Sequence, residues 1–275
     1  MLQKHKTPLI KVIFLSATGF FLFVCMDSTA KYLGSVMPVT QVVWGRFFFH
    51  FMALCLYFLA FRPQLNLKKN FRIQIIRSIL MVTATFFMFN SLQRFDLVDI
   101  YVVFFSAPLI VSILSAYFLK DILSSKGIIL MLLSFGSIIY SMGPSMKVLS
   151  PELIFPIVPP LCWALYQFFT KLISGNNEPF TAAFYTAILG ALIFTIYISF
   201  NWVTIENNYL WIGLILMGIF GFISHFVIIY AIQLSNLSFV TNFQYSQLLW
   251  STVINFVIFG VPFDASKIIG VIGII

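Results

Sequence analysis

Residues 8–30 read PLIKVIFLSATGFFLFVCMDSTA, and this stretch decides the class of fold. It carries one lysine and one aspartate, and it is long enough to cross a bilayer as a helix, which takes about 20 predominantly apolar residues. Over the whole chain, 61% of the residues are hydrophobic and only 9% are charged. Because a soluble domain has about 25% charged residues, the solvent for most of these side chains must be lipid.

Apolar runs of similar length repeat along the chain with short polar breaks. They predict an all-α membrane protein of ten transmembrane helices. The last run, from Ala265 to Ile275, gives only about 16 Å of helix, roughly half of the hydrocarbon thickness. We therefore expect the tenth helix to be truncated here and the natural chain to continue. The predicted spans lie near 8–30, 38–60, 72–92, 98–118, 125–143, 151–170, 180–200, 209–231, 239–259 and from 265 onward.

The cations predict the orientation of these spans. Cytoplasmic loops carry an excess of lysine and arginine, and most of the 16 lysines and arginines fall on the side that holds the N-terminus. We expect a cytoplasmic N-terminus in the inner (plasma) membrane, and this distribution also explains the net charge of +8 without a nucleic-acid partner. The N-terminal side holds Lys4, Lys6, Lys11, Arg62, Lys68, Lys69, Arg72, Arg77, Lys120, Lys126 and Lys171, and the opposite side holds Lys31, Arg94, Lys147 and Lys267.

The two halves of the chain resemble each other at an offset of about 140 residues. They predict one five-helix repeat over 8–143 and a second over 151–275. Because each repeat has an odd number of spans, the second copy enters the membrane from the opposite side, which makes an inverted repeat. The alternative is chance similarity between apolar segments. The clearest matches are Lys31 and Pro38 with Lys171 and Pro179, Gln93 with Gln233, and Leu97 with Leu237.

Charged side chains at membrane depth are costly and need a reason. Asp27 lies near the outer end of the first span, with Lys31 one turn further out. Arg46 lies at a similar depth in the second span, and His50 is one turn away on the same face. One hypothesis is that Asp27 lines a transport cavity and binds substrate or a proton. The other is a structural pair of Asp27 with Arg46 or Lys31 that only neutralises charge.

The repeat extends this site to the second half. At the 140-residue offset, Asp27 corresponds to Gln167 and Phe23 to Trp163. Gly19 in the first span matches Pro159 in the sixth, and such helix breakers at matching places predict freed backbone groups that face substrate. The alternative is that these residue types are simply common in membrane helices. The predicted substrate-binding residues are Phe23, Asp27, Asn90, Trp163, Tyr166, Gln167, Asn242 and Tyr245, and the predicted structural or coupling charges are Lys31, Arg46 and His50.

Motifs of an enzyme are missing from the sequence. It has no HExxH pair, no phosphate-binding glycine loop, no GxSxG elbow and no CxxC. Cys25, Cys55 and Cys162 lie in apolar runs without the spacing of metal ligands. We expect neither catalysis nor a cofactor or metal.

Several stretches resemble the drug/metabolite transporter superfamily in its EamA branch. Lys31, Pro38 and Arg46 follow its pattern of a lysine that closes span one, a proline that opens span two and an arginine within it. There are departures, because Lys120-Asp121 stands where Gly-Glu is usual, Val261 where Glu is usual, and Leu248 where the second copy has proline. The other similar stretches are residues 108–127, 162–171 and 250–262.

This resemblance implies two inverted EamA repeats around a central cavity, with both termini cytoplasmic. It also implies alternating-access transport of a small metabolite without ATP hydrolysis. Residues 27–31 and 41–46 look most like bacterial members that carry S-adenosylmethionine or riboflavin, and other members carry amino acids. The partners expected are this substrate and the lipid bilayer, with a homodimer left open. The competing interpretation is a membrane protein that does not transport, such as a membrane enzyme or a scaffold.

Overall fold

A computed structural model describes residues 9–95, 97–119, 129, 132–133, 136, 151–175 and 179–259 of the protein. Every regular element in these ranges is a helix, as the apolar periodicity predicts. The predicted span from 265 onward lies outside the described residues. The one near 125–143 does too, apart from four single positions.

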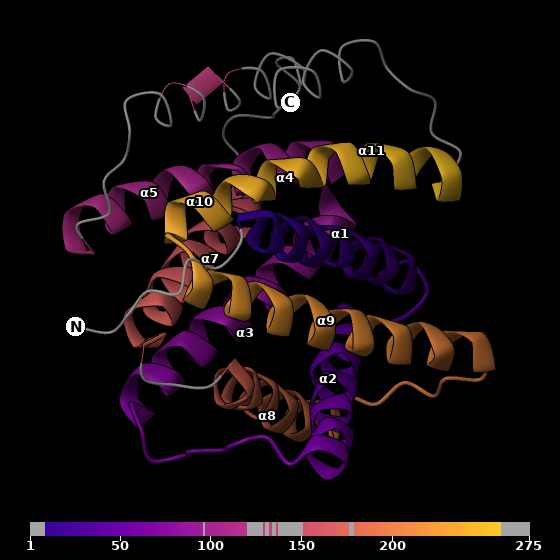
Figure 1. The fold of residues 1–275 in the computed structure, drawn as a ribbon. Coiled ribbons are helices and arrows are strands. Elements are labelled where there is room, and N and C mark those ends of the chain that lie inside the picture. Colours follow the sequence, from indigo (N-terminus) through magenta and orange to yellow (C-terminus); the bar gives the residue numbers. More distant parts are fainter. Residues whose placement is uncertain are drawn as a thin grey trace.

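The described helices follow the predicted spans closely. Figure 1 shows them coloured along the sequence, from indigo at the N-terminus to yellow at the C-terminus. Six segments are long and apolar enough to cross a membrane: α1, α2, α3, α7 together with the short 3-10 turn Pro151–Leu153 before it, α8 and α9. The bounds are α1 Leu9–Gly34, α2 Val39–Phe61, α3 Phe71–Arg94, α4 Leu97–Phe104, α5 Ser106–Phe118, α7 Ile154–Ile173, α8 Pro179–Ile198, α9 Asn208–Leu234, α10 Leu237–Asn242 and α11 Ser246–Phe259.

Large apolar side chains cover the outside of this bundle. Phe14, Leu59, Ile113 and Ile196 project from four different helices, and each is well exposed. Such a surface is unfavourable in water. Contiguous exposed apolar patches of this kind mark membrane or protein contacts. Together with the helix lengths, the surface identifies a multi-pass membrane protein.

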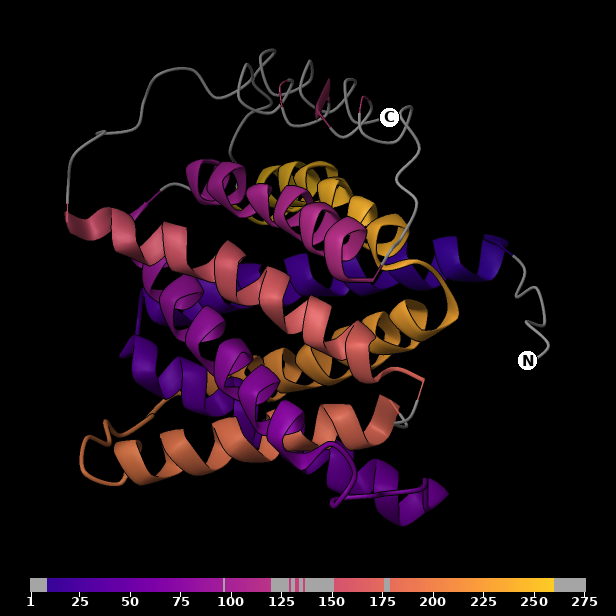
Figure 2. The same ribbon diagram turned by 90° about the vertical axis from the view of Figure 1, so that its left-hand side faces the viewer.

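Helices of the two halves interleave rather than forming separate bundles. α1 packs most extensively on α9, and α3 packs on α7. α2 packs on both α8 and α9. In the two repeats α7 corresponds to α1, and α9 corresponds to α3. Exchanging the halves therefore maps the pair α1–α9 onto the pair α7–α3, which indicates an approximate two-fold relation. Figure 2 shows α1 running away from the N-terminus toward the left while α7 runs left to right, so these equivalent helices are antiparallel.

Residues 140 positions apart touch each other near the centre of the bundle. The rings of Phe105 and Tyr245 have centroids 5.5 Å apart, and those of Phe23 and Trp163 are 5.3 Å apart. A residue can contact its own equivalent only close to the axis that relates two copies. These pairs therefore mark where the two repeats meet.

The interrupted helices are not the ones that the sequence predicts. Despite Gly19 and Pro159, α1 and α7 are continuous. The breaks lie instead between α4 and α5, and at the 3-10 turn Phe243–Tyr245 between α10 and α11. Each break has the same local bond: Ser106 Oγ donates to the Val103 carbonyl at 2.6 Å, and Ser246 Oγ donates to the Phe243 carbonyl at 2.6 Å. The expectation of broken first and sixth spans is thus corrected to broken fourth and ninth spans.

Gly218 sets the close approach of α9 to α2. A Cβ atom at this position would lie 2.3 Å from the Phe49 Cβ and 2.9 Å from the backbone nitrogen of His50. Small residues allow membrane helices to approach in this way. The contact brings the polar face of α2 against His225 of α9.

Candidate substrate-binding site

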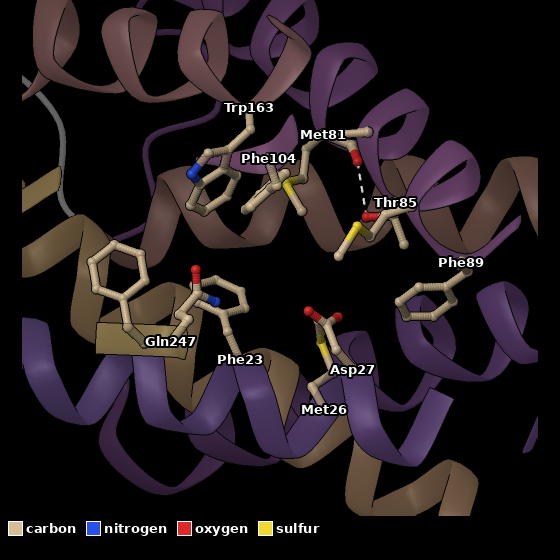
Figure 3. Close-up of a pocket in the computed structure, with 12 residues that line it drawn as sticks. Phe23, Met26, Asp27, Met81, Thr85, Phe89, Phe104, Trp163 and Gln247 are labelled. Atoms are coloured by element: carbon tan, nitrogen blue, oxygen red, sulfur yellow. Dashed lines mark hydrogen bonds between the residues drawn. The ribbon is translucent and has the colours of Figure 1, made fainter. Parts of the chain in front are cut away.

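A cavity of about 40 Å³ lies between α1, α3, α4, α7 and α11 (Figure 3). It holds only a few water molecules, since each needs roughly 10–15 Å³ by this measure. An organic substrate therefore requires the lining side chains to move. The lining residues are Phe20, Phe23, Met26, Asp27, Met81, Ala84, Thr85, Met88, Phe89, Phe104, Trp163 and Gln247.

Asp27 supplies the formal charge of the lining. It shares one face of α1 with Phe20 and Phe23, because residues three, four and seven positions apart fall on the same side of a helix. Its side chain is buried, and Figure 3 shows the carboxylate pointing from α1 across the cavity toward α3. Tyr101 donates its hydroxyl to Oδ2 of Asp27 at 3.1 Å. The second carboxylate oxygen can therefore accept a bond from a cation in the cavity.

Aromatic rings from both repeats form one wall of the cavity. Trp163 packs edge-on against Phe23 and lies parallel to Tyr166, with ring centroids 5.4 Å apart. Its indole Nε1 donates to Oε1 of Gln244 at 3.0 Å. The amide nitrogen of Gln244 in turn donates to the carbonyl of Phe104 at 3.3 Å, so the two helix breaks are tied to the wall. Flat apolar rings of this kind suit a planar or cationic ligand.

Methionines make the opposite side of the cavity adaptable. Met81 and Met88 lie two turns apart on α3, and Met26 projects from α1. Unbranched thioether side chains fill irregular space and change rotamer at low cost. The small volume in this structure can thus expand without backbone unfolding.

A polar cluster lies behind the aromatic wall. Arg46 is fully buried, and its Nη2 lies 2.7 Å from Nε2 of His225. The other ring nitrogen of His225 is 3.3 Å from the Tyr166 hydroxyl. The His50 ring stacks on His225 with centroids 5.8 Å apart. The guanidinium carbon of Arg77 lies over the Tyr166 ring, 4.5 Å from its centroid.

The predicted structural pair of Asp27 with Arg46 is not formed. Among the described side chains, Asp27 accepts its bond from Tyr101, and Arg46 contacts His225 instead. Lys31 lies at the C-terminal end of α1, near the edge of the bundle.

The predicted substrate residues fall into three groups. Phe23, Asp27 and Trp163 line the cavity. A second group is buried close behind the lining, and a third lies away from the cavity. Tyr166 belongs to the second group, because it stacks on Trp163. Asn90 belongs to the third, because its amide bonds within α3 to the Phe86 carbonyl at 2.8 Å.

Three further predicted residues have buried polar atoms without a partner in the described part of the chain. These are both amide atoms of Gln167, Oδ1 of Asn242 and the hydroxyl of Tyr245. Tyr245 packs its ring on Phe105 at the helix breaks. None of them lines the cavity in this conformation.

The sequence analysis does not name Tyr101 and Gln247 as site residues, and it does not predict that Arg77 is buried. Arg77 is assigned above to the cytoplasmic end of a span, yet it is fully buried. Its Nε donates to Thr170 at 3.0 Å, and Nη1 donates to the Ala182 carbonyl at 2.6 Å. A helical spacing with Met81, Thr85 and Met88 is the sequence signal that could have shown the inward face of α3.

No group of three or more metal-ligating side chains is found in the described parts of the chain. The cavity itself is lined by one carboxylate, one amide and several aromatic faces.

Comparison with known proteins gives a consistent result. A family model described as the EamA-like transporter family matches residues 10–143 and again residues 150–275. An S-adenosylmethionine uptake transporter of Rickettsia felis is 24% identical over 268 residues, covering 95% of this chain and 90% of the relative. The transporter of the same description from Rickettsia bellii is 23% identical over 263 residues, with 94% and 90% covered.

One solved crystal structure has a similar fold. Its TM-score is 0.77 at 16% sequence identity, and the alignment covers 96% of this chain and 93% of the other. At this identity the likeness concerns the fold alone.

Proposed function

Because the chain belongs to the EamA-like transporter family, we propose that it is a secondary transporter that moves a small organic metabolite across the membrane by alternating access. The same membership means that the chain is a transporter and not an enzyme. The observation that carries the proposal is the buried Asp27 carboxylate, which points into an aromatic cavity between the two repeats.

The substrate is an organic cation or zwitterion with a planar ring. A carboxylate in a low-dielectric site favours a positive charge, and aromatic faces add a cation–π attraction of about 0.5–2 kcal/mol. A cofactor of the S-adenosylmethionine type combines a cationic centre with a flat base, and similar proteins carry that description. We place it ahead of free amino acids and of riboflavin, which lacks the positive charge.

The topology is that of ten helices in two inverted repeats, residues 8–143 and 151–275. The antiparallel course of α1 and α7 supports the inversion (Figure 2). The contacts of Phe23 with Trp163 and of Phe105 with Tyr245 support an axis through the cavity. The lysines and arginines support a cytoplasmic N-terminus in the inner membrane. The cavity is built from one chain, so transport does not require a second copy.

The breaks in the fourth span, between α4 and α5, and in the ninth span, between α10 and α11, act as the hinge of the transport cycle. Discontinuous helices at the midplane are the usual place where one repeat rocks against the other. Here both breaks meet at Gln244, which bonds to Trp163 in one direction and to Phe104 in the other. A substrate that moves Trp163 therefore acts directly on both breaks.

Uptake into vesicles that hold the purified full chain tests the proposal. The labelled compounds are S-adenosylmethionine, methionine, lysine and riboflavin, and the variant is Asp27→Asn. Removing one charge-assisted bond of about 1.5–3 kcal/mol lowers kcat/KM by roughly 10- to 150-fold.

Glu206→Gln is the matched control, because Glu206 is an exposed acid in the loop between α8 and α9. It should transport as the unchanged protein does. Uptake of none of the compounds counts against the transporter, and equal uptake by the Asp27 and Glu206 variants counts against the role of Asp27.

A further inference from the structure

The polar cluster behind the cavity has buried polar atoms that no described protein group satisfies. Nε and Nη1 of Arg46 and both ring nitrogens of His50 are buried without a hydrogen-bond partner. Both side chains are fully buried. Buried polar groups are normally paired, and an unpaired guanidinium is among the most costly exceptions. An acceptor is therefore missing from this cluster.

A buried guanidinium carries a positive charge and only donates, so a negatively charged acceptor suits its unpaired N–H groups best. A guanidinium only donates, so Nε2 of His225, 2.7 Å from Nη2, must be the acceptor. This assignment leaves the His225 proton on Nδ1, beside the Tyr166 hydroxyl. His225 is thus neutral and does not offset the charge of Arg46. The buried acid Asp27 is bonded to Tyr101 on the cavity side.

His225 of this cluster is separated from the cavity only by aromatic rings of the cavity lining. His225 lies edge-on to Phe23 with ring centroids 4.8 Å apart, and to Trp163 with centroids 6.0 Å apart. Both rings line the cavity. A ligand held by Asp27 can reach this cluster only if Phe23 moves aside.

We propose that Arg46 binds the carboxylate of a zwitterionic substrate while Asp27 binds its cationic group. The ligand class is a compound with an amino-acid head group, and one such molecule neutralises both buried charges at once. This inference rests on the proposed transport function and specifies the substrate class of that same site.

The arrangement also assigns a role to His50 and His225. His225 holds one edge of the Arg46 guanidinium, so the remaining donors keep a fixed direction. His50 is one turn from Arg46 on α2, and its ring packs on His225 from the other side. His225 takes one N–H of Nη2, so a bidentate contact with a carboxylate would use the other N–H of Nη2 together with Nε or Nη1.

Paired substrates that differ only in the carboxylate test the proposal. The probes are S-adenosylmethionine with its decarboxylated form, and methionine with its methyl ester, in vesicles that hold the full chain. The unchanged protein should favour the carboxylate form in kcat/KM by about 10- to 100-fold, the size of a charge-assisted contact. Arg46→Gln should bring the ratio close to one.

Arg77→Gln is the matched control, because Arg77 is equally buried and also lies over an aromatic ring, but its Nε and Nη1 bond to protein groups and only Nη2 has no partner. It should keep the preference for the carboxylate form even if it is less stable. Arg46→Lys keeps the charge without the fork, and it should retain only part of the preference.

The comparison of paired substrates in the unchanged protein can overturn the proposal by itself, so the test does not depend on whether a variant folds. Equal transport of the two forms contradicts a carboxylate site while leaving the transporter intact. Uptake of riboflavin without uptake of S-adenosylmethionine or methionine also contradicts a carboxylate site and leaves the transporter intact. If uptake depends on chloride and ignores the carboxylate, Arg46 holds a free anion and the proposal is overturned. Uptake of no compound at all is instead a failure of the proposed function.

Discussion

Replacing Gly218 with alanine should separate α9 from α2 and lower the stability of the folded protein. The added Cβ would lie 2.3 Å from the Phe49 Cβ, 2.8 Å from the Phe49 carbonyl carbon and 2.9 Å from the His50 nitrogen. Two of these atoms belong to the backbone, so no side-chain rotation relieves the overlap. Overpacking of this kind costs about 1–3 kcal/mol.

Thermal unfolding in detergent gives the readout. For a chain of this size, each kcal/mol shifts Tm by about 2–4 °C, so Gly218→Ala should lower Tm by roughly 2–12 °C. Because the same contact places His225 beside Arg46, the substrate-induced rise in Tm should also shrink.

Gly175→Ala is the matched control. No atom lies within 4 Å of a Cβ built at Gly175, so this variant should unfold at the temperature of the unchanged protein. If both glycine variants unfold at the same temperature, the packing of α9 on α2 described here is wrong.

Two further variants probe hydrogen bonds of the aromatic wall and the cavity. Trp163→Phe keeps a ring but removes the bond to Gln244, and it should cost about 1 kcal/mol of unfolding free energy; Trp250→Phe, whose indole nitrogen has no partner in the described chain, should cost much less. Equal losses in unfolding experiments would argue against the Trp163 bond. Tyr101→Phe leaves Asp27 without its donor, so the substrate-free protein should be less stable by about 1–3 kcal/mol. The same variant should then gain more than the unchanged protein when a cationic substrate is added, and a smaller gain would contradict the contact.

The spans and the repeat could be predicted because they depend on local composition. A run such as residues 8–30 specifies a membrane helix without knowledge of its neighbours. The 140-residue offset also placed Phe23 opposite Trp163, and the structure brings these rings into contact. For this pair near the axis between the repeats, the 140-residue offset was enough to predict the contact.

The helix breaks could not be predicted from residue type. Pro159 and Pro160 lie within the continuous helix α7, because membrane helices tolerate proline where neighbouring groups satisfy the freed carbonyls. Gly19 stays helical and packs against Ile228 of α9. The break at Phe105 lies one turn before Pro108, which has no N–H for the Phe104 carbonyl, but the break at Phe243–Tyr245 has Leu248 at the equivalent position, so residue type does not predict both breaks.

The partners of the buried charges could not be predicted either. Asp27 bonds to Tyr101, 74 positions away, and Arg46 contacts His225, 179 positions away. These pairings depend on the lateral packing of helices, which helical periodicity does not specify. Cation counting likewise does not show that Arg77, near the start of α3, is buried against α7 and α8.

Counterflow of S-adenosylmethionine tests most directly the claim that the cavity opens alternately to the two sides. Vesicles holding the purified chain are loaded with unlabelled compound, and entry of labelled compound from outside is followed. Saturable entry that is faster into loaded than into empty vesicles, and that is lost in Asp27→Asn at unchanged folding, is the expected result. Entry that does not saturate, or that is the same with loaded vesicles, empty vesicles and the Asp27 variant, would contradict a carrier built around this carboxylate.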